Sequence, residues 1–304
     1  WITILLDGLL AFILLILKIP YVLYFHGEGY KNYETRSNPL FKAIVREVLR
    51  NSIGGIVVGE KLKSDVNHCI PDERLFVLPN GIPDIERGEG FRKKEKENGR
   101  LNVLFLSNLV DFKGPLEFLK MAQAVVEKEK NVRFILAGEP ADPAYYESLL
   151  HYIKENCLED RLSLPGGVYG EEKEKLFQSA DVFVLPTFKD TFGMVNVEAM
   201  RWSLPVVSSD VGAISEVVID GINGYIVYPG CISELADRVL MLLRNENLRI
   251  KMGGQGRRRF EENYSLEAYN RKVQDAMSFF LRRLPPGKIS MKQPLGVDSP
   301  CAEF

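Results

Sequence analysis

The chain has 304 residues, of which 46% are hydrophobic and 26% are charged, and its formal net charge is −2. This length exceeds one typical domain and predicts two, and the composition is ordinary for a soluble globular protein. The near-neutral charge gives no electrostatic reason to expect nucleic acid as a partner. The cysteines lack metal-site spacing, so we interpret them as reduced thiols of a cytosolic protein. They are Cys69, Cys157, Cys231 and Cys301.

The first segment of the chain is apolar and starts at Trp1. Asp7 precedes the apolar stretch Leu9–Leu17, and Lys18-Ile19-Pro20 ends it. A membrane-spanning helix needs about 20 apolar residues, so we favour a buried helix over one that contacts a membrane. Neither the basic leader nor the cleavage site of a signal peptide is found. Because no strand or cap precedes this apolar start, we expect that the sequence lacks an N-terminal portion.

Residues 1–95 are predicted to form a partial N-terminal domain. Apolar residues at helical spacing predict a helix over Pro39–Arg50. The charged, glycine-containing segment Asp84–Arg100 predicts a solvated linker or surface loop and not a binding patch. Short apolar runs that end in turn residues predict strands over Tyr21–Phe25, Gly55–Val58 and Leu75–Leu78.

Strands and helices alternate through residues 96–265, which is typical of a doubly wound parallel sheet. Pro115 opens the first helix of this region, at a position where its missing N–H costs nothing. Further helices are expected over Pro143–Asn156, Ile232–Asn245 and Leu248–Asn263. The strands are expected at Asn102–Leu106, Val132–Ala137, Arg161–Leu164, Val182–Leu185, Pro205–Ser208 and Tyr225–Val227.

The C-terminal part of the chain is predicted to leave this second domain. Residues 266–283 have helical character and are expected to form a helix that returns toward the N-terminal domain. Residues 284–304 contain four prolines and little periodicity, so we expect them to be disordered.

Ligands of open parallel sheets bind at the carboxyl ends of the strands, and the most informative motif lies there. Segment Asp190–Glu198 places two carboxylates eight positions apart, one in a loop and one on a helix, with Gly193 near the helix start. A helix N-terminus suits a phosphate, and a helix carboxylate can accept hydrogen bonds from vicinal sugar hydroxyls. The motif indicates a phosphorylated sugar or nucleotide. Taken alone, the motif has an equally good structural explanation, in which the glutamate only interacts favourably with the helix dipole.

Other polar motifs also follow strands. Lys113 lies just before a helix, where a cation can neutralise a diphosphate, although a solvated lysine has the same appearance. Taken alone, Asn80-Gly81 indicates a structural turn. A single histidine after a strand, such as His26, is as often a structural polar residue as a functional one. The shared position of these motifs at strand ends favours a ligand site more than any one of them does.

In their order along the chain these segments resemble the retaining glycosyltransferases of family 4, which have the α/β GT-B fold of two facing, doubly wound Rossmann-like domains. The resemblance covers roughly residues 20–283. It implies that the N-terminal domain is incomplete, because the glycine-rich loop of the family has no counterpart. The motifs that carry it are Pro79-Asn80-Gly81-Ile82, Lys113-Gly114, the two carboxylates around Phe192-Gly193, the stretch from Pro205 to Glu216, and the glycine turn Asp220–Gly224.

The resemblance implies transfer of a sugar, with its anomeric configuration retained, from a nucleotide-diphosphate sugar to a glycan or lipid-linked acceptor. It implies no metal or other cofactor. Lys113 is then the catalytic cation for the leaving diphosphate, Asp190 approaches the donor sugar, and His26 contacts the sugar or the acceptor. The donor-binding residues implied are Asn108, Gly138, Val168, Phe192, Gly193, Met194, Val195 and Glu198.

The chain departs from the family pattern at two site positions. Asn108 stands where the family has an arginine, so one cationic phosphate contact is lost or replaced. Asp190 stands where the family has the first glutamate of its pair, and its carboxylate reaches one methylene less far.

Two other functions remain open. A sugar-nucleotide epimerase shares the GT-B architecture but needs bases for proton transfer at C2, and Lys113 with the two carboxylates fits group transfer better. A non-catalytic nucleotide-sugar-binding protein is compatible with Asn108. The family and the apolar start also suggest a cytoplasmic protein with peripheral contact to the inner face of the membrane.

Overall fold

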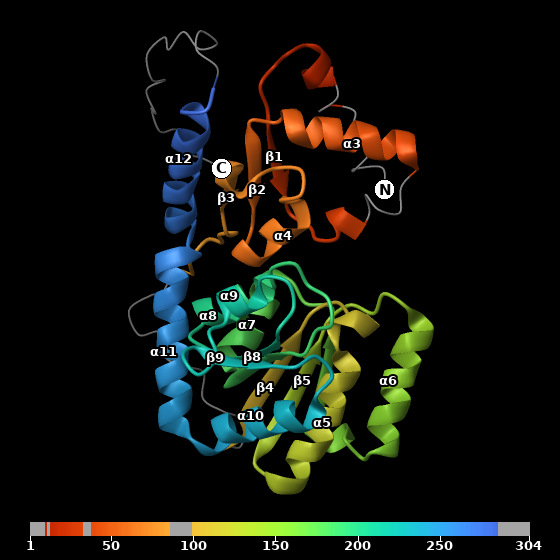
Figure 1. The fold of residues 1–304 in the computed structure, drawn as a ribbon. Helices are drawn as coiled ribbons and strands as arrows, with labels where there is room; N and C mark the ends of the chain where they lie inside the picture. Colours follow the sequence, from red (N-terminus) through yellow and green to blue (C-terminus); the bar gives the residue numbers. More distant parts are fainter. Residues whose placement is uncertain (1–9, 11–12, 33–37, 86–98, 285–304) are drawn as a thin grey trace.

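The structure is a computed structural model and describes residues 10, 13–32, 38–85 and 99–284. It contains two lobes, each built on a parallel sheet (Figure 1). Helix α11 (Glu246–Asn263) runs beside the second lobe, and α12 (Leu266–Leu281) continues along the first lobe. The α/β class with parallel sheets and the returning C-terminal helix were both predicted from the sequence.

The first lobe has a three-stranded parallel sheet in the order β1-β2-β3 within the described residues. Its main helix, α3 (Pro39–Asn51), begins where the Asn38 side chain accepts a hydrogen bond from the Phe41 N–H at 2.8 Å. The predicted strands and helix of this lobe are confirmed to within two residues. The strands are β1 (Val22–Phe25), β2 (Gly54–Val57) and β3 (Leu75–Val77).

The N-terminal apolar segment is not buried as predicted. Among its described residues, Leu10, Ile16 and Leu17 are 57%, 63% and 61% exposed. Only Leu14 and Leu15 pack, against Tyr21 and its neighbours. The prediction of a buried helix is therefore wrong for this part of the chain, because no described element covers its outer side. In the described residues, moreover, we find no helix with the length and apolar character needed to cross a membrane.

The second lobe has a six-stranded sheet in the order β6-β5-β4-β7-β8-β9, with every neighbouring pair parallel. The order reverses between β4 and β7, which is the switch point of a doubly wound fold and its usual ligand crevice. All six strands were predicted. They are β4 (Leu101–Leu106), β5 (Val132–Ala137), β6 (Leu162–Gly166), β7 (Val182–Leu185), β8 (Val206–Ser209) and β9 (Gly224–Val227).

Helices cover both faces of this sheet and bury its apolar side chains. Phe105 of β4 packs against Phe118, which in turn meets Phe134 of β5 edge-on at a centroid distance of 5.9 Å. All three rings are fully buried, so the sheet edge that carries the site rests on a rigid core. The helices of this lobe are α5 (Pro115–Lys128), α6 (Pro143–Glu155), α7 (Gly170–Ser179), α8 (Met194–Arg201), α9 (Ile214–Val217) and α10 (Ile232–Arg244).

In the described part of the chain, two segments that pass between the lobes lie side by side. The Ile82 N–H donates to the Tyr264 carbonyl at 2.9 Å, and Ile82 forms a parallel bridge with Ser265. Beyond this point Asp84 forms a two-fold ion pair with Arg257, whose Nη1 lies 2.6 Å from Oδ1. Asp84 is thus paired with α11 but remains exposed in the segment that joins the lobes, in agreement with the predicted linker or surface loop.

Several sequence predictions lie outside the described residues. They include most of the predicted linker, at 86–98, the predicted disordered tail from 285 onward, and Cys301. The other three cysteines are free thiols, as expected. The domain boundaries at residues 95, 265 and 283 remain predictions.

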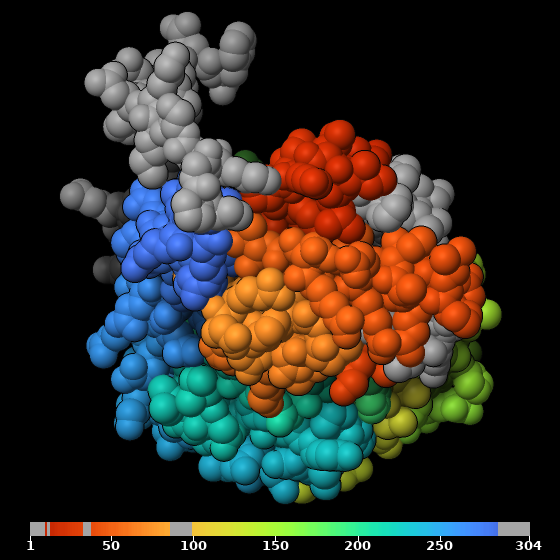
Figure 2. Space-filling view, turned by 45° about the horizontal axis from the view of Figure 1, so that its top comes forward, coloured from red at the N-terminus to blue at the C-terminus, as the bar shows by residue number. Residues whose placement is uncertain are grey.

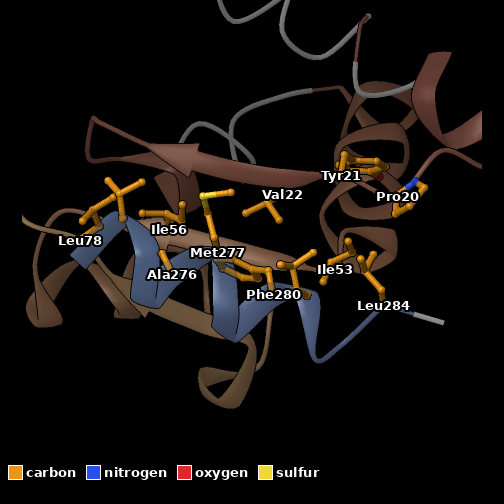
Figure 3. Close-up of a pocket in the computed structure, with 12 residues that line it drawn as sticks. Pro20, Tyr21, Val22, Ile53, Ile56, Leu78, Ala276, Met277, Phe280 and Leu284 are labelled. Atoms are coloured by element: carbon orange, nitrogen blue, oxygen red, sulfur yellow. The ribbon is translucent and has the colours of Figure 1, made fainter. Parts of the chain in front are cut away.

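An apolar pocket of about 450 Å³ lies between the first sheet and α12 (Figure 3). Phe280 and Met277 of α12 point toward Ile56 and Val22 of the sheet across it. The pocket carries no charged side chain, so it is chemically unlike the strand-end site described next. Its lining is Pro20, Tyr21, Val22, Ile53, Ile56, Leu78, Val273, Ala276, Met277, Phe280, Leu281 and Leu284.

Candidate functional site

The loops that follow β4 and β7 meet at the switch point of the second sheet. The Phe112 carbonyl accepts hydrogen bonds from the Phe188 N–H at 2.8 Å and the Thr187 hydroxyl at 2.9 Å. Gly114 allows this approach, since it has φ of +78° and a Cβ there would lie 2.1 Å from the Pro186 carbonyl oxygen. Two segments far apart in sequence are thereby fixed to each other.

Lys113 and Asp190 form an ion pair at this junction. The Lys113 ammonium lies 2.6 Å from Asp190 Oδ2, and both side chains are about four-fifths buried, at 21% and 17% exposed. The other carboxylate oxygen, Oδ1, accepts from the Gly193 N–H at 2.9 Å and the Phe192 N–H at 3.3 Å. One carboxylate therefore holds the lysine beside the backbone that opens α8.

Glu198 lies four residues into α8, about 6 Å along the axis from the first residue of the helix. Its Oε1 is 2.7 Å from the Lys173 ammonium of α7, and the two side chains are 18% and 25% exposed. Oε2 has no protein partner among the described residues. A carboxylate fixed through one oxygen, with the other available, is suited to accept hydrogen bonds from a diol.

Lys173 was missed by the sequence reasoning. It lies in the run Glu171-Glu172-Lys173-Glu174-Lys175, which has the composition of a solvated helix face. Nothing in that run distinguishes Lys173, which pairs with Glu198, from Lys175, which pairs with Glu171 at 3.5 Å.

A pocket of about 320 Å³ opens beside the Lys113–Asp190 pair, and an adjoining polar pocket has a volume of about 490 Å³. Glu28 of the first lobe and Lys189 of the second line both pockets. Desolvation raises the pKa of the Glu28 carboxyl, against the opposing effect of Lys189 and Lys113. The site is thus a charged cleft that both lobes line. Its charged residues are Glu28, Lys61 and Asp65 of the first lobe and Lys113, Lys189 and Asp190 of the second.

Glu28 was also missed, although a signal for it existed. It lies two residues after His26 in the same strand-end loop. His26 itself is exposed and stacks on Tyr24 at a ring distance of 3.9 Å. Within the described residues no contact joins His26 to the Lys113–Asp190 pair, whereas Glu28 lines the pocket beside that pair.

The remaining residues predicted to bind the donor lie either at the start of α8 or near the ends of other strands. Phe192 is buried edge-on against Tyr264 and offers only its backbone to the site, while Met194 and Val195 form the first turn of α8. Asn108 is exposed after β4, and Val168 packs on the core between β6 and α7. Gly138 ends β5, where a Cβ would lie 1.8 Å from the Ser107 carbonyl oxygen.

The described residues contain no group of three or more His, Cys, Asp or Glu side chains arranged to hold a metal ion. The prediction that the reaction needs no metal is not tested by this arrangement and remains a prediction.

The sequence model of the family described as glycosyl transferases group 1 matches residues 86–259, more than half of the chain. This chain belongs to the group 1 glycosyl transferases. The matched region holds Lys113, Lys173, Asp190 and Glu198, so the charged wall of the second lobe lies within the family's shared sequence.

Named proteins of this family resemble the chain over part of its length. An uncharacterized glycosyltransferase of Methanocaldococcus jannaschii is 32% identical over 199 residues, which are 61% of this chain and 50% of that protein. The capsular polysaccharide biosynthesis glycosyltransferase CapM of Staphylococcus aureus is 25% identical over 75% of this chain and 62% of its own. This group 1 chain thus spans 50% and 62% of the length of these two relatives.

The fold has a close counterpart among solved structures. HepE of Anabaena, solved in complex with UDP, superposes with a TM-score of 0.78 at 19% identity, over 89% of this chain and 75% of its own. At this identity the likeness concerns the fold alone. It confirms the predicted GT-B class for this group 1 glycosyl transferase.

Proposed function

We propose that the chain is part of a retaining glycosyltransferase of family 4. In this proposal the second lobe binds a nucleotide-diphosphate sugar, and the sugar passes to a glycan or lipid-linked acceptor held in the cleft. The observation that carries the proposal is the Lys113–Asp190 pair, fixed at the switch point and beside the start of α8. Family membership supports sugar transfer, and the site geometry supports the choice of donor.

In this proposal the Lys113–Asp190 pair lies beside the bond between the sugar and the leaving diphosphate. As the bond from the anomeric carbon to phosphate breaks, negative charge develops on the diphosphate and positive charge on the sugar. The Lys113 ammonium and the N–H groups of Met194 and Val195 in the first turn of α8 stabilise the first charge, while the preceding N–H groups of Phe192 and Gly193 hold Asp190. The Asp190 carboxylate, held beside them, stabilises the second.

Glu198 is assigned to the nucleoside. Its Oε1 is neutralised by Lys173, and Oε2 is available to accept hydrogen bonds from the ribose hydroxyls. The distance of about 6 Å along α8 between the helix start and Glu198 suits a ligand with a phosphate at one end and a diol at the other. No metal is needed for this assignment, since the lysine and the helix supply the positive charge.

The proposal is tested by titrating UDP, GDP and ADP, and then their glucose and N-acetylglucosamine conjugates, into the protein by calorimetry. We expect one base to bind at micromolar Kd in a buffer containing EDTA. Transfer to a glycan acceptor, followed by NMR, should give a product with the anomeric configuration of the donor. Failure of all three nucleotides to bind would refute the donor assignment, and an inverted product would refute retention.

The two alternatives make different predictions in the same experiment. An epimerase would isomerise the sugar nucleotide without any acceptor, and the named relatives above are all glycosyltransferases. A non-catalytic binding protein would bind the nucleotide and release no sugar to any acceptor. The acceptor class and peripheral membrane contact are part of the proposal, and CapM is named for capsular polysaccharide biosynthesis.

A further inference from the structure

The two lobes are joined across the cleft by a set of charged contacts. Both oxygens of the Glu216 carboxylate on α9 accept hydrogen bonds from the first lobe, from the N–H groups of Glu60 and Lys61, each at 2.7 Å. The Lys61 ammonium reaches back to Asp210 Oδ1 at 2.7 Å and to the Ser215 hydroxyl at 2.6 Å. We call Glu216, Lys61 and Asp210 the interlobe clamp.

The clamp lies where the surfaces of the two lobes are in contact. In Figure 2 the orange surface of the first lobe lies directly on the teal and cyan surface of the second. A Cβ added at Gly59 would lie 2.4 Å from the Ala213 Cβ. Any larger residue at position 59 would therefore push α9 away from the turn η1 (Glu60–Leu62).

The same segment of the second lobe is tied to the proposed donor loop. The Ala213 N–H donates to the Thr191 carbonyl at 2.9 Å, one residue beyond Asp190. Gly212 and Lys61 line the polar pocket together with Glu28. Residues 210–216 thus contact the donor loop on one side and the first lobe on the other.

We propose that Glu216 is a positioning residue for sugar transfer, which rests on the function proposed above. Through the interlobe clamp it holds the first lobe, and with it Glu28, at a fixed distance from the donor loop. A carboxylate is required because two adjacent N–H groups face it. A glutamine offers a single oxygen, and its amide NH₂ would face the second N–H.

The components of the clamp differ in strength. Lys61 and Asp210 are each about half exposed, so their ion pair contributes little alone. The bonds from backbone N–H groups to a carboxylate are charge-assisted and stronger. Glu216→Gln is therefore the variant that separates the lobes, and Lys61→Glu is a weaker one.

The test combines binding, transfer and shape in Glu216→Gln, with Glu234→Gln as the matched control. Glu234 also accepts a hydrogen bond from a backbone N–H, that of Tyr228 at 3.2 Å, but within one lobe. The nucleotide used is whichever of UDP, GDP and ADP the wild-type protein binds. We expect the Kd of Glu216→Gln for this nucleotide to stay within twofold of the wild-type value. Its kcat/KM should fall at least tenfold, its radius of gyration by small-angle scattering should rise, and the Glu60 and Lys61 amides should exchange faster with deuterium.

Two further variants secure the result. The Lys61→Glu change should lower kcat/KM severalfold, and the double change Lys61→Glu with Asp210→Lys should restore part of it by re-forming the pair. Gly59→Ala should reproduce the Glu216→Gln phenotype without altering any charge, and it decides the case if Glu216→Gln does not fold.

Two outcomes overturn the proposal. One is wild-type transfer, scattering and amide exchange in both Glu216→Gln and Gly59→Ala. The other is a parallel loss of nucleotide affinity and melting temperature, which would show that Glu216 only supports the fold of the second lobe. If wild-type protein binds none of the three nucleotides, the proposed function fails, while scattering and amide exchange still test the clamp.

Discussion

The two lobes contribute to the site in different ways. The second lobe supplies two lysine–carboxylate pairs of nearly equal length, 2.6 and 2.7 Å, both largely buried and both attached to the loops and helices of one sheet. The first lobe supplies Glu28, Lys61 and Asp65, which line the polar pocket. Under the proposed function, this difference assigns donor recognition to the second lobe, whereas the first lobe acts through its position. Each prediction below tests one side of that division.

The largest effect is expected from Lys113→Ala. Removing the cation at the leaving diphosphate should lower kcat by 10²–10³-fold, or about 3–4 kcal/mol, the size of losing one oxyanion-stabilising contact. Steady-state kinetics with the donor found by titration measures it. Lys120→Ala is the matched control, since Lys120 lies on the outer part of α5 and only pairs loosely with Glu117 at 3.8 Å. Unchanged turnover in Lys113→Ala would contradict the role assigned to Lys113 at the leaving diphosphate.

Glu198→Ala should come next and should act on binding. We expect nucleotide affinity to fall by about 1.5–3 kcal/mol, the range for a hydrogen bond to a charged group. Lys173→Ala should weaken affinity less, because the carboxylate remains but is no longer held. Calorimetry on both variants and the double mutant gives their coupling energy. Additive effects of the two changes would show that Glu198 and Lys173 do not act as a unit in binding.

A third prediction concerns how strongly the lobes are coupled. Arg257 joins α11 to Asp84 just after the chain leaves the first lobe, and its side chain is only 13% exposed. Arg257→Ala should destabilise the protein by about 2–3 kcal/mol, because it leaves the Asp84 carboxylate without its bidentate partner. Calorimetric unfolding should then show two transitions in place of one. A single unshifted transition would mean that the lobes unfold together for another reason.

The smallest effect is expected at Glu28. Its folded-state pKa is raised by desolvation, so the charged carboxylate opposes folding at neutral pH and ceases to do so below its unfolded value of about 4.3. Glu28→Gln should therefore raise the free energy of unfolding at pH 7 by about 0.5 kcal/mol or less, given its solvent exposure, and by less at pH 4. Urea denaturation at both pH values measures it. A constant difference would contradict the assigned cause.

The sequence predicted the second lobe better than the first, for a physical reason. Its strands are apolar runs bounded by turns, and their carboxyl ends marked Lys113 and Asp190 as site residues. That these two touch depends on β4 lying beside β7, which no local pattern specifies. Lys173 could not be found, because a lysine in a charged helix looks the same whether it faces water or Glu198.

The first lobe yielded less to sequence reasoning. His26 attracted attention as a residue type, while Glu28 in the same loop did not, and only the three-dimensional structure shows which of them faces the pocket. The exposed side chains of Ile16 and Leu17 were expected to be buried, since apolarity alone does not say what covers a residue. Contacts such as Glu216 with Lys61, 155 positions apart, also depend on how the lobes pack.

The paired crossings of the chain restrict how the lobes can move. Because Ile82 and Tyr264 are hydrogen-bonded where they pass from one lobe to the other, the two strands of chain act as a single pivot. Rotation about that line would open and shut the cleft while leaving the bond intact. Sliding one lobe past the other would break it, at a cost of about 1 kcal/mol. The lobes can therefore turn about that line only if the hydrogen bonds from Glu60 and Lys61 to Glu216 open first.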